Sequence, residues 1–567
     1  MINRSLQVLA KAFPFDVNGD KELQQALRFL DSDLSTKTVI KAGYVTAFLT
    51  CMLLTPLVHL VPTGHQIEYL IGILLIAIVA GQLIFKYPLI MATLQQTTAL
   101  GTAPALIGRA ILRMRIDPSE ETAVAFAAKT GNDRLSKSLS KHINRAAGEP
   151  GSGLDTFAKE WQQWFPALGR AAQLLGTAGS APPAQRERAL NRALSAVLNG
   201  TSGELRAFVT NVNGPATALY AFGVLIPLAL VAVLPGAHAA GVTITMPVIV
   251  LIYNVILPVA LLSASVWLLL RRPVAFPPPQ VTEEHLDKTR SKWYIIGLGV
   301  CTGGAAGAVS KMLIGLWTVP ISVTGIGVGS TLVLWYRPHT KVRDKVREVE
   351  AGLPDALYLI GRQVDEGTSV ERSIAEAGKG LQDETGKLLT DAARRQEVLA
   401  VGIREALLGE QGALTQLPSR RTKNLASLLS IASKEGQPAG HAIVAMADHL
   451  DELQSVEQEA RHELAKVTNT LTNTAAIFGP LVAGSTVALA EGMHTFGEGE
   501  DIQTIAVSEL GLAIGGYVLL LAVVLVGLST TLKHGLDRPT IGYGTGGTLI
   551  SATTVFFVAY YGTELLL

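Results

Sequence analysis

Short clusters of arginine and lysine are the residues of this chain whose type and spacing suggest chemistry. Clustered positive charge attracts acidic partner surfaces, although a solvated face is the simpler interpretation of any single residue. The basic group in 337–347 lies beside an apolar segment and could instead attract anionic lipid. The segment 418–423 concentrates charge with no acidic residue next to it in the sequence, so we expect it to contact a partner. The clusters are Arg109, Arg113 and Arg115; Arg186, Arg188 and Arg192; Arg394 and Arg395; and Arg420, Arg421 and Lys423.

No catalytic or metal-binding pattern accompanies these clusters. The sequence contains no GxxxxGK[ST] or HExxH pattern and no GxSxG pattern on a strand-to-helix turn, so neither nucleotide hydrolysis nor a common hydrolase is indicated. His441, His449 and His462 share one predicted helix without i+3 or i+4 spacing, so we expect solvated or partly packed side chains. Cys51 and Cys301 lie far apart in apolar runs, and we expect both to be buried. We therefore predict no enzyme activity, no catalytic residue, no cofactor and no metal site.

Glycine-rich runs at 325–329 and 542–547 resemble phosphate-binding loops only superficially. Both lie in or next to apolar segments, and Gly299, Gly303 and Gly307 repeat at i+4 spacing in another such segment. Small residues at that spacing let membrane helices approach closely. We therefore interpret these glycines as helix-packing positions.

Composition places the chain among membrane proteins with substantial polar parts. Hydrophobic residues make up 49% and charged residues 16%, and the mean hydropathy is +0.35, which is too apolar for an ordinary soluble domain of this length. A spanning helix needs about 20 mostly apolar residues. Nine stretches qualify, with a turn marked by Pro320 between the fifth and the sixth: 43–61, 68–85, 216–235, 245–270, 294–312, 317–336, 469–490, 511–530 and 541–562.

The orientation follows from the lysine and arginine residues beside the spans. Three connections carry them, for example at Arg271, Arg343 and Lys533, whereas the alternate connections 62–67, 236–244 and 491–510 carry none. This pattern predicts a cytoplasmic N-terminus and an external C-terminus in the cell membrane. The expected organisation is a cytoplasmic segment (1–42), a transmembrane hairpin (43–86), a cytoplasmic helical domain (87–212), two transmembrane helices (213–271), a cytoplasmic linker (272–293), a second hairpin (294–336), a second cytoplasmic helical domain (337–467) and three transmembrane helices with an acidic external loop at 491–510 (468–567).

An internal duplication underlies this organisation. The sequence LIGR at 106–109 recurs at 359–362, and ALYAFG at 218–223 recurs in softened form as TAAIFG at 474–479. The order of apolar and polar segments around both pairs also repeats, and an ordered set of matches indicates duplication rather than chance. The fold class we predict is an all-α polytopic membrane protein with about nine transmembrane helices and two duplicated cytoplasmic helical bundles.

The second polar stretch shows the helical periodicity most clearly. Leu353, Leu357, Ile360 and Val364 form one apolar stripe, Gly367 ends it, and Thr368 and Ser369 are capping residues for a following helix. Leu425, Leu428, Leu429 and Ala432 form another apolar face, which Gly436 and Pro438 end. A long helix then runs from about Ala439 into the seventh span without a break. Its polar side is expected to carry Asp448, Asp451, Glu452, Glu457 and Arg461.

These segments resemble the type II secretion F domain. The resemblance rests on LPDAL (353–357) with DEGTSVERSI (365–374), and on EGQP (435–438) followed by ADHL (447–450). The first copy departs from the pattern, because PSEE (118–121) stands where the second has GTS. The duplicated layout is most similar to the archaeal-type platform proteins of type IV pili, the archaellum and Tad-like secretion systems. The resemblance covers most of residues 43–530.

The resemblance implies a platform at the base of an extracellular filament, without catalytic activity of its own. In that family the cytoplasmic domains engage a hexameric secretion ATPase, which moves the platform so that pilin-like or archaellin-like subunits enter the growing fibre. A homodimer in a lipid membrane is the expected state, and no nucleic acid is expected. We assign the ATPase-facing surface to Arg113, Arg115, Arg186, Arg188, Arg394, Arg395, Arg420, Arg421 and Lys423.

A secondary transporter or permease built from two repeats is the alternative, since repeats also build transporters. Transporters normally place ionisable groups in the middle of the membrane. The nine stretches are almost bare of such groups, and Lys311 lies near a predicted helix end, where its side chain can reach the interface. A transporter also has little use for two large cytoplasmic domains, so we favour the platform.

Overall fold

The computed structural model shows a wholly helical chain in the ranges that it describes, which are 2–60, 66–131, 133–146, 153–239, 245–271, 281, 292–435, 438–496, 506–535 and 537–566. Nine helical runs in these ranges are long and apolar enough to cross a membrane. The predicted class is confirmed: the chain is an all-α, multi-pass membrane protein. The predicted linker 272–293 and the middle of the loop 491–510 lie almost entirely outside the described residues.

Two long helices connect the membrane part to the polar domains in the same way. Each starts at a proline, which suits the first turn of a helix because its missing N–H would have no intrahelical partner there. Each then continues through one π-helical segment into the membrane, so the unbroken run expected from Ala439 is present. The first run comprises α10 (Pro183–Tyr220), η3 (Ala221–Leu225) and α11 (Ile226–Ala239), and the second comprises α22 (Pro438–Asn473), η8 (Thr474–Phe478) and α23 (Gly479–Phe496).

The remaining apolar helices complete the membrane part. The turn before the sixth span lies at Gly315, which has a φ of 152°, and not at Pro320 as predicted, because Pro320 occupies the first turn of the next helix. The helices are α3 (Thr36–Leu54), α4 (Gln66–Leu100), α12 (Met246–Val250) with η4 (Leu251–Ile256) and α13 (Leu257–Leu270), α14 (Lys292–Leu313), α15 (Val319–Ser322) with η7 (Val323–Val328) and α16 (Gly329–Ala351), α24 (Val507–His534) and α25 (Arg538–Glu564).

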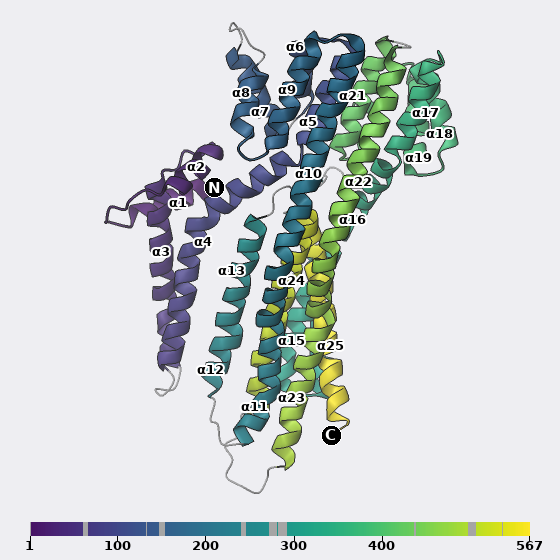
Figure 1. Cartoon of the computed structure of the whole chain (residues 1–567). Helices are drawn as coiled ribbons and strands as arrows, with labels where there is room; N and C mark the ends of the chain where they lie inside the picture. Colours follow the sequence, from purple (N-terminus) through teal and green to yellow (C-terminus); the bar gives the residue numbers. More distant parts are fainter. Residues whose placement is uncertain are drawn as a thin grey trace.

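Two helical bundles with the same order of elements stand at one end of the membrane helices (Figure 1). Bundle 1 is α5 to α9 with the first part of α10, and bundle 2 is α17 to α21 with the first part of α22. In both bundles a serine, Ser119 or Ser369, caps the second helix by accepting a backbone N–H. The short helices are α5 (Ala103–Ile116), α6 (Glu120–Thr130), α7 (Arg134–Ala146), α8 (Leu154–Trp161) and α9 (Pro166–Ser180) in bundle 1, and α17 (Leu353–Asp365), α18 (Val370–Gly380), α19 (Glu384–Leu399), α20 (Ile403–Leu408) and α21 (Arg420–Glu435) in bundle 2.

The apolar stripes predicted for bundle 2 form its core. The stripe from Leu353 to Val364 is buried, as is the Leu425 face of α21. Gly367 ends α17 with a φ of 94°, a conformation that favours glycine because it has no side chain to clash. One expected position was wrong: Glu457, placed on the polar side of the long helix, is buried. The reason is tertiary, since α21 packs against α22 and its Arg421 contacts Glu457.

Glycines let the membrane helices pack closely, as the i+4 spacing predicted. A Cβ at Gly303 of α14 would lie 2.8 Å from the Cα of Gly327 in η7. A Cβ at Gly546 of α25 would lie 2.7 Å from the carbonyl oxygen of Gly329 in α16. The glycine-rich runs therefore lie in helices and serve packing. Cys301 is exposed on α14, contrary to the expectation of burial, whereas Cys51 is half-buried.

The two chain ends lie at opposite ends of the membrane helices (Figure 1). The helices α1 (Ile2–Lys11) and α2 (Lys21–Phe29) pack against α3 and α4 at the end that carries the bundles, whereas α25 ends at the far side. An odd number of crossings requires this arrangement.

Candidate functional site

Most of the cations predicted to face a partner are engaged within their own bundle. Arg186 donates hydrogen bonds to the carbonyl oxygens of Ala178 (3.3 Å) and Ala181 (3.0 Å), which caps the end of α9. Arg188 and Arg192 are exposed on α10. The other pairs are Arg113 with Asp117 (3.4 Å), Arg115 with Glu187 (3.3 Å), Arg394 with Asp391 (3.0 Å) and Arg395 with Asp391 (2.8 Å).

The segment 418–423 is not a charged loop without acids, as the sequence suggested. Arg420, Arg421 and Lys423 lie in the first turn of α21, and two carboxylates from other helices meet Arg421. Its guanidinium contacts Glu457 of α22 and lies 3.7 Å from Glu350 of α16. The expectation that no acid lies nearby was wrong, because Glu350 and Glu457 are distant from Arg421 in the sequence.

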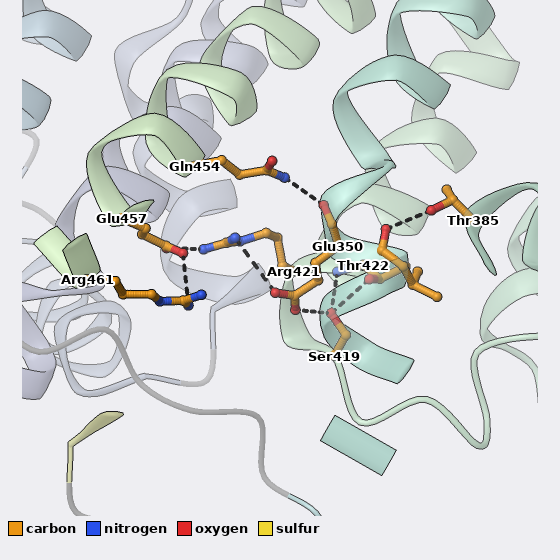
Figure 2. Close-up of polar contacts among 9 residues, drawn as sticks. Glu350, Thr385, Ser419, Arg421, Thr422, Gln454, Glu457 and Arg461 are labelled. Carbon is orange, nitrogen blue, oxygen red and sulfur yellow. Dashed lines mark hydrogen bonds and ion pairs between the residues drawn. The ribbon is translucent and has the colours of Figure 1, made fainter. Parts of the chain in front are cut away.

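Arg421 is the centre of a polar network that joins three helices (Figure 2). Ser419 donates its hydroxyl proton to Glu350 (2.6 Å) and also accepts the backbone N–H of Thr422 (3.0 Å), so it caps α21. Gln454 donates to the backbone carbonyl of Glu350 (2.6 Å). The network therefore fixes the start of α21 against α16 and α22.

Electrostatics keep Arg421 charged. Burial alone would lower the pKa of its guanidinium, but the attraction of Glu457 and then of Glu350 outweighs burial and raises the pKa above its ordinary value. Arg461 shares Glu457 at 3.7 Å. Two guanidinium groups thus compete for one buried carboxylate.

The duplicated LIGR sequence places two glycines against one helix. A side chain at Gly108 of α5 would overlap the ring of His449, and a Cβ at Gly361 of α17 would lie 2.8 Å from the backbone nitrogen of Val444. Both partners belong to the first part of α22, so this part of α22 contacts both α5 and α17. His449 is buried there, which corrects the expectation of a solvated or partly packed histidine.

The arginines that follow these glycines differ in role. Arg109 is buried and pairs with Asp133 (3.5 Å) and with the hydroxyl of Ser136 (2.9 Å). Arg362 is exposed and pairs with Glu366 on its own helix (3.1 Å). The copies therefore diverge in chemistry at a position where their sequences match.

A cavity of about 440 Å³ lies where the two bundles meet the ends of the membrane helices. Residues of α5, α16, α21, α22, α24 and α25 line it, including eight arginine or lysine side chains and three carboxylates. Four of these cations belong to the basic clusters predicted from the sequence: Arg109, Arg420, Arg421 and Lys423. Arg343 and Arg347 belong to the basic group in 337–347 that was used to orient the spans and could attract anionic lipid, Lys533 was used only for orientation, and Arg461 was placed on the polar side of the long helix.

The described residues contain no group of three or more histidine, cysteine, aspartate or glutamate side chains that could hold a metal ion. No family model, no curated protein and no solved structure matches the chain. The arrangement of bundles, long helices and cavity is therefore the basis for any functional conclusion.

Proposed function

We propose that this protein is the membrane platform of a type IV filament assembly machine. In this role it couples a cytoplasmic hexameric secretion ATPase to the insertion of pilin-like or archaellin-like subunits. The observation that carries the proposal is that each bundle ends in one helix that continues into the membrane, through η3 in the first copy and η8 in the second. A displacement of either bundle is thereby passed to the membrane part through a continuous helix.

The surroundings of α22 support a mechanical role. Arg421 of α21 pairs with Glu457 on this helix, and Arg206 of α10 pairs with Glu459 on it. The two transmitting helices are therefore joined to each other before they enter the membrane. Both bundles lie on the cytoplasmic side in this proposal, with the N-terminus inside the cell, the C-terminus outside and a homodimer as the working unit.

The exposed cations remain the proposed contacts with the ATPase. Arg188, Arg394 and Arg420 are exposed, and Lys423 is half-buried beside Arg420. Charge complementarity would guide the encounter and would weaken with salt. A repeat-built transporter is the competing function, and flux by the purified protein alone would distinguish it.

Interrupting the transmitting helix tests the proposal. Insertion of three glycines after Glu463 should leave membrane insertion and ATPase binding intact and abolish filament assembly, because a flexible joint does not transmit force. Insertion of three alanines at the same place is the matched control. It adds the same number of residues and the same rotation about the helix axis as the three glycines, but it keeps the helix rigid. Filament numbers are counted by electron microscopy. Normal filaments with the glycine insertion would refute transmission through α22.

A further inference from the structure

The cavity between the bundles holds more positive charge than its own carboxylates neutralise. Asp133 pairs with Arg109, while Glu350 and Glu457 both pair with Arg421. The amino group of Lys533, at the end of α24, donates to the neutral side chain of Asn469 (2.7 Å). Arg347 pairs only weakly with the exposed Asp344, at 3.8 Å. Like charges gathered in a partly enclosed space repel one another, so an anion would stabilise this arrangement.

Buried hydrogen-bond donors at the same place also lack acceptors. Among the described residues, no acceptor meets the Nε atoms of Arg109 and Arg343, and Nδ1 of His449, which donates or accepts according to its tautomer, has no partner either; all three side chains are buried and line the cavity. Buried polar atoms are normally satisfied, so several unsatisfied ones in one cavity indicate a ligand. The terminal nitrogens of Arg343 contact Asp537 and Thr540, so Nε is the guanidinium nitrogen that has no partner.

We propose that this cavity binds a phosphate-bearing anion through the guanidinium and ammonium groups of α16, α21, α22 and α24. Six of its eight cations are arginines, and the planar guanidinium group matches phosphate oxygens in pairs. The volume lies within the range of small-molecule sites. The proposal goes beyond the platform function and does not depend on it.

The same chemistry is offered by a soluble phosphate compound and by the headgroup of an anionic lipid. Lys533 and His534 close the last turn of the membrane helix α24, and Thr540 lies in the first turn of α25. The cavity is thus next to the place where these helices leave the apolar part, within reach of headgroups. Basic pockets at such places bind anionic lipids.

Binding is tested with the full-length protein in nanodiscs. One arm titrates inorganic pyrophosphate into protein in phosphatidylcholine nanodiscs by calorimetry. The second arm compares retention of phosphatidylglycerol by native mass spectrometry after reconstitution in mixed lipid. The variant Lys423→Gln/Lys533→Gln removes two cavity charges, and Lys137→Gln/Lys379→Gln removes the same charge from exposed sites on α7 and α18. We expect the cavity variant to lose about tenfold or more in affinity, as for two charge-assisted contacts, and the control to bind like the wild type.

Each outcome either supports or overturns the binding of an anion in the cavity. Loss of pyrophosphate binding in the cavity variant assigns a soluble ligand, and loss of phosphatidylglycerol retention assigns a lipid headgroup. If Lys533→Gln prevents folding, Lys423→Gln alone is measured, since that side chain is only half-buried. Equal binding by cavity and control variants, or absence of binding to the wild type in both arms, would overturn the proposal.

Discussion

Arg343 of α16 and Asp537, the residue that caps α25, form a buried ion pair although they lie 194 residues apart in the sequence. Asp537 also accepts the backbone N–H of Thr540 (3.3 Å), and Arg343 donates to the Thr540 hydroxyl. The carboxylate of Asp537 thus caps the start of α25 and also holds this helix to α16, which leads into bundle 2.

Removing Asp537 should destabilise the protein strongly. The variant Asp537→Ala leaves the Arg343 guanidinium buried without its carboxylate, and breaking a buried pair in this way costs about 3–5 kcal/mol. Thermal unfolding in detergent measures the loss. The double variant Arg343→Met/Asp537→Ala should recover most of it, because no unpaired buried charge remains. The exposed pair of Lys37 and Asp16 is the control: Asp16→Ala should leave the melting temperature nearly unchanged.

Charge reversal at Arg421 should affect folding, whereas reversal at Arg420 should not. Arg421→Glu brings a third carboxylate to Glu350 and Glu457, and we expect bundle 2 to become sensitive to proteolysis. Arg421→Gln should cost less, about 1.5–3 kcal/mol for the lost charged hydrogen bonds. Arg420→Glu changes an exposed side chain in the same turn and should remain as protease-resistant as the wild type. Any loss of ATPase binding by Arg420→Glu would then reflect the contact itself, and resistance of Arg421→Glu to proteolysis would contradict the role of the network.

Two adjacent glycines in α14 give a matched test of close packing. Gly303→Ala introduces a methyl group against η7 and should cost about 1–3 kcal/mol through overpacking. Gly304→Ala adds the same methyl group where no atom lies within 4 Å, and it should be neutral or slightly stabilising because alanine favours a helix. The difference in melting temperature between the two variants is the measurement. Equal effects would show that the contact between α14 and η7 is looser than described.

The proposed orientation can be checked by cysteine labelling in intact cells, after Cys51 and Cys301 have been replaced. Gln163→Cys in bundle 1 and Lys379→Cys in bundle 2 occupy exposed positions, and both should resist an impermeant thiol reagent until the membrane is opened. Leu566→Cys, at the opposite end, should label at once. Exposed positions are needed for labelling, because buried positions such as Ser136 and Ser419 would stay unlabelled on either side of the membrane. External labelling of Lys379→Cys would reverse the orientation.

Local pattern was enough to predict the elements of this fold. Apolar runs marked nine spans, and the stripe from Leu353 to Val364 with Gly367 marked α17 and its end, because these features depend on neighbours in the sequence. The environment of Arg421 was not predictable in the same way, since Glu350 and Glu457 reach it only when α16, α21 and α22 pack together. The π-helical segments η3 and η8 were also missed, although both lie in or beside the repeated sequence around Gly223 and Gly479. The residues of these two segments have the same apolar pattern as an ordinary membrane α-helix.

The membrane core has a consequence for the duplication. One continuous apolar cluster contains Phe208 and Leu261 of the first half together with Leu471, Tyr517 and Phe556 of the second. Within that cluster Tyr517 donates its hydroxyl proton to the backbone carbonyl of Gly223. The repeated plan is therefore not a repeated folding unit. Each half made alone would expose the apolar surface that the other half covers, so the membrane part reaches its packed state only when both copies are present.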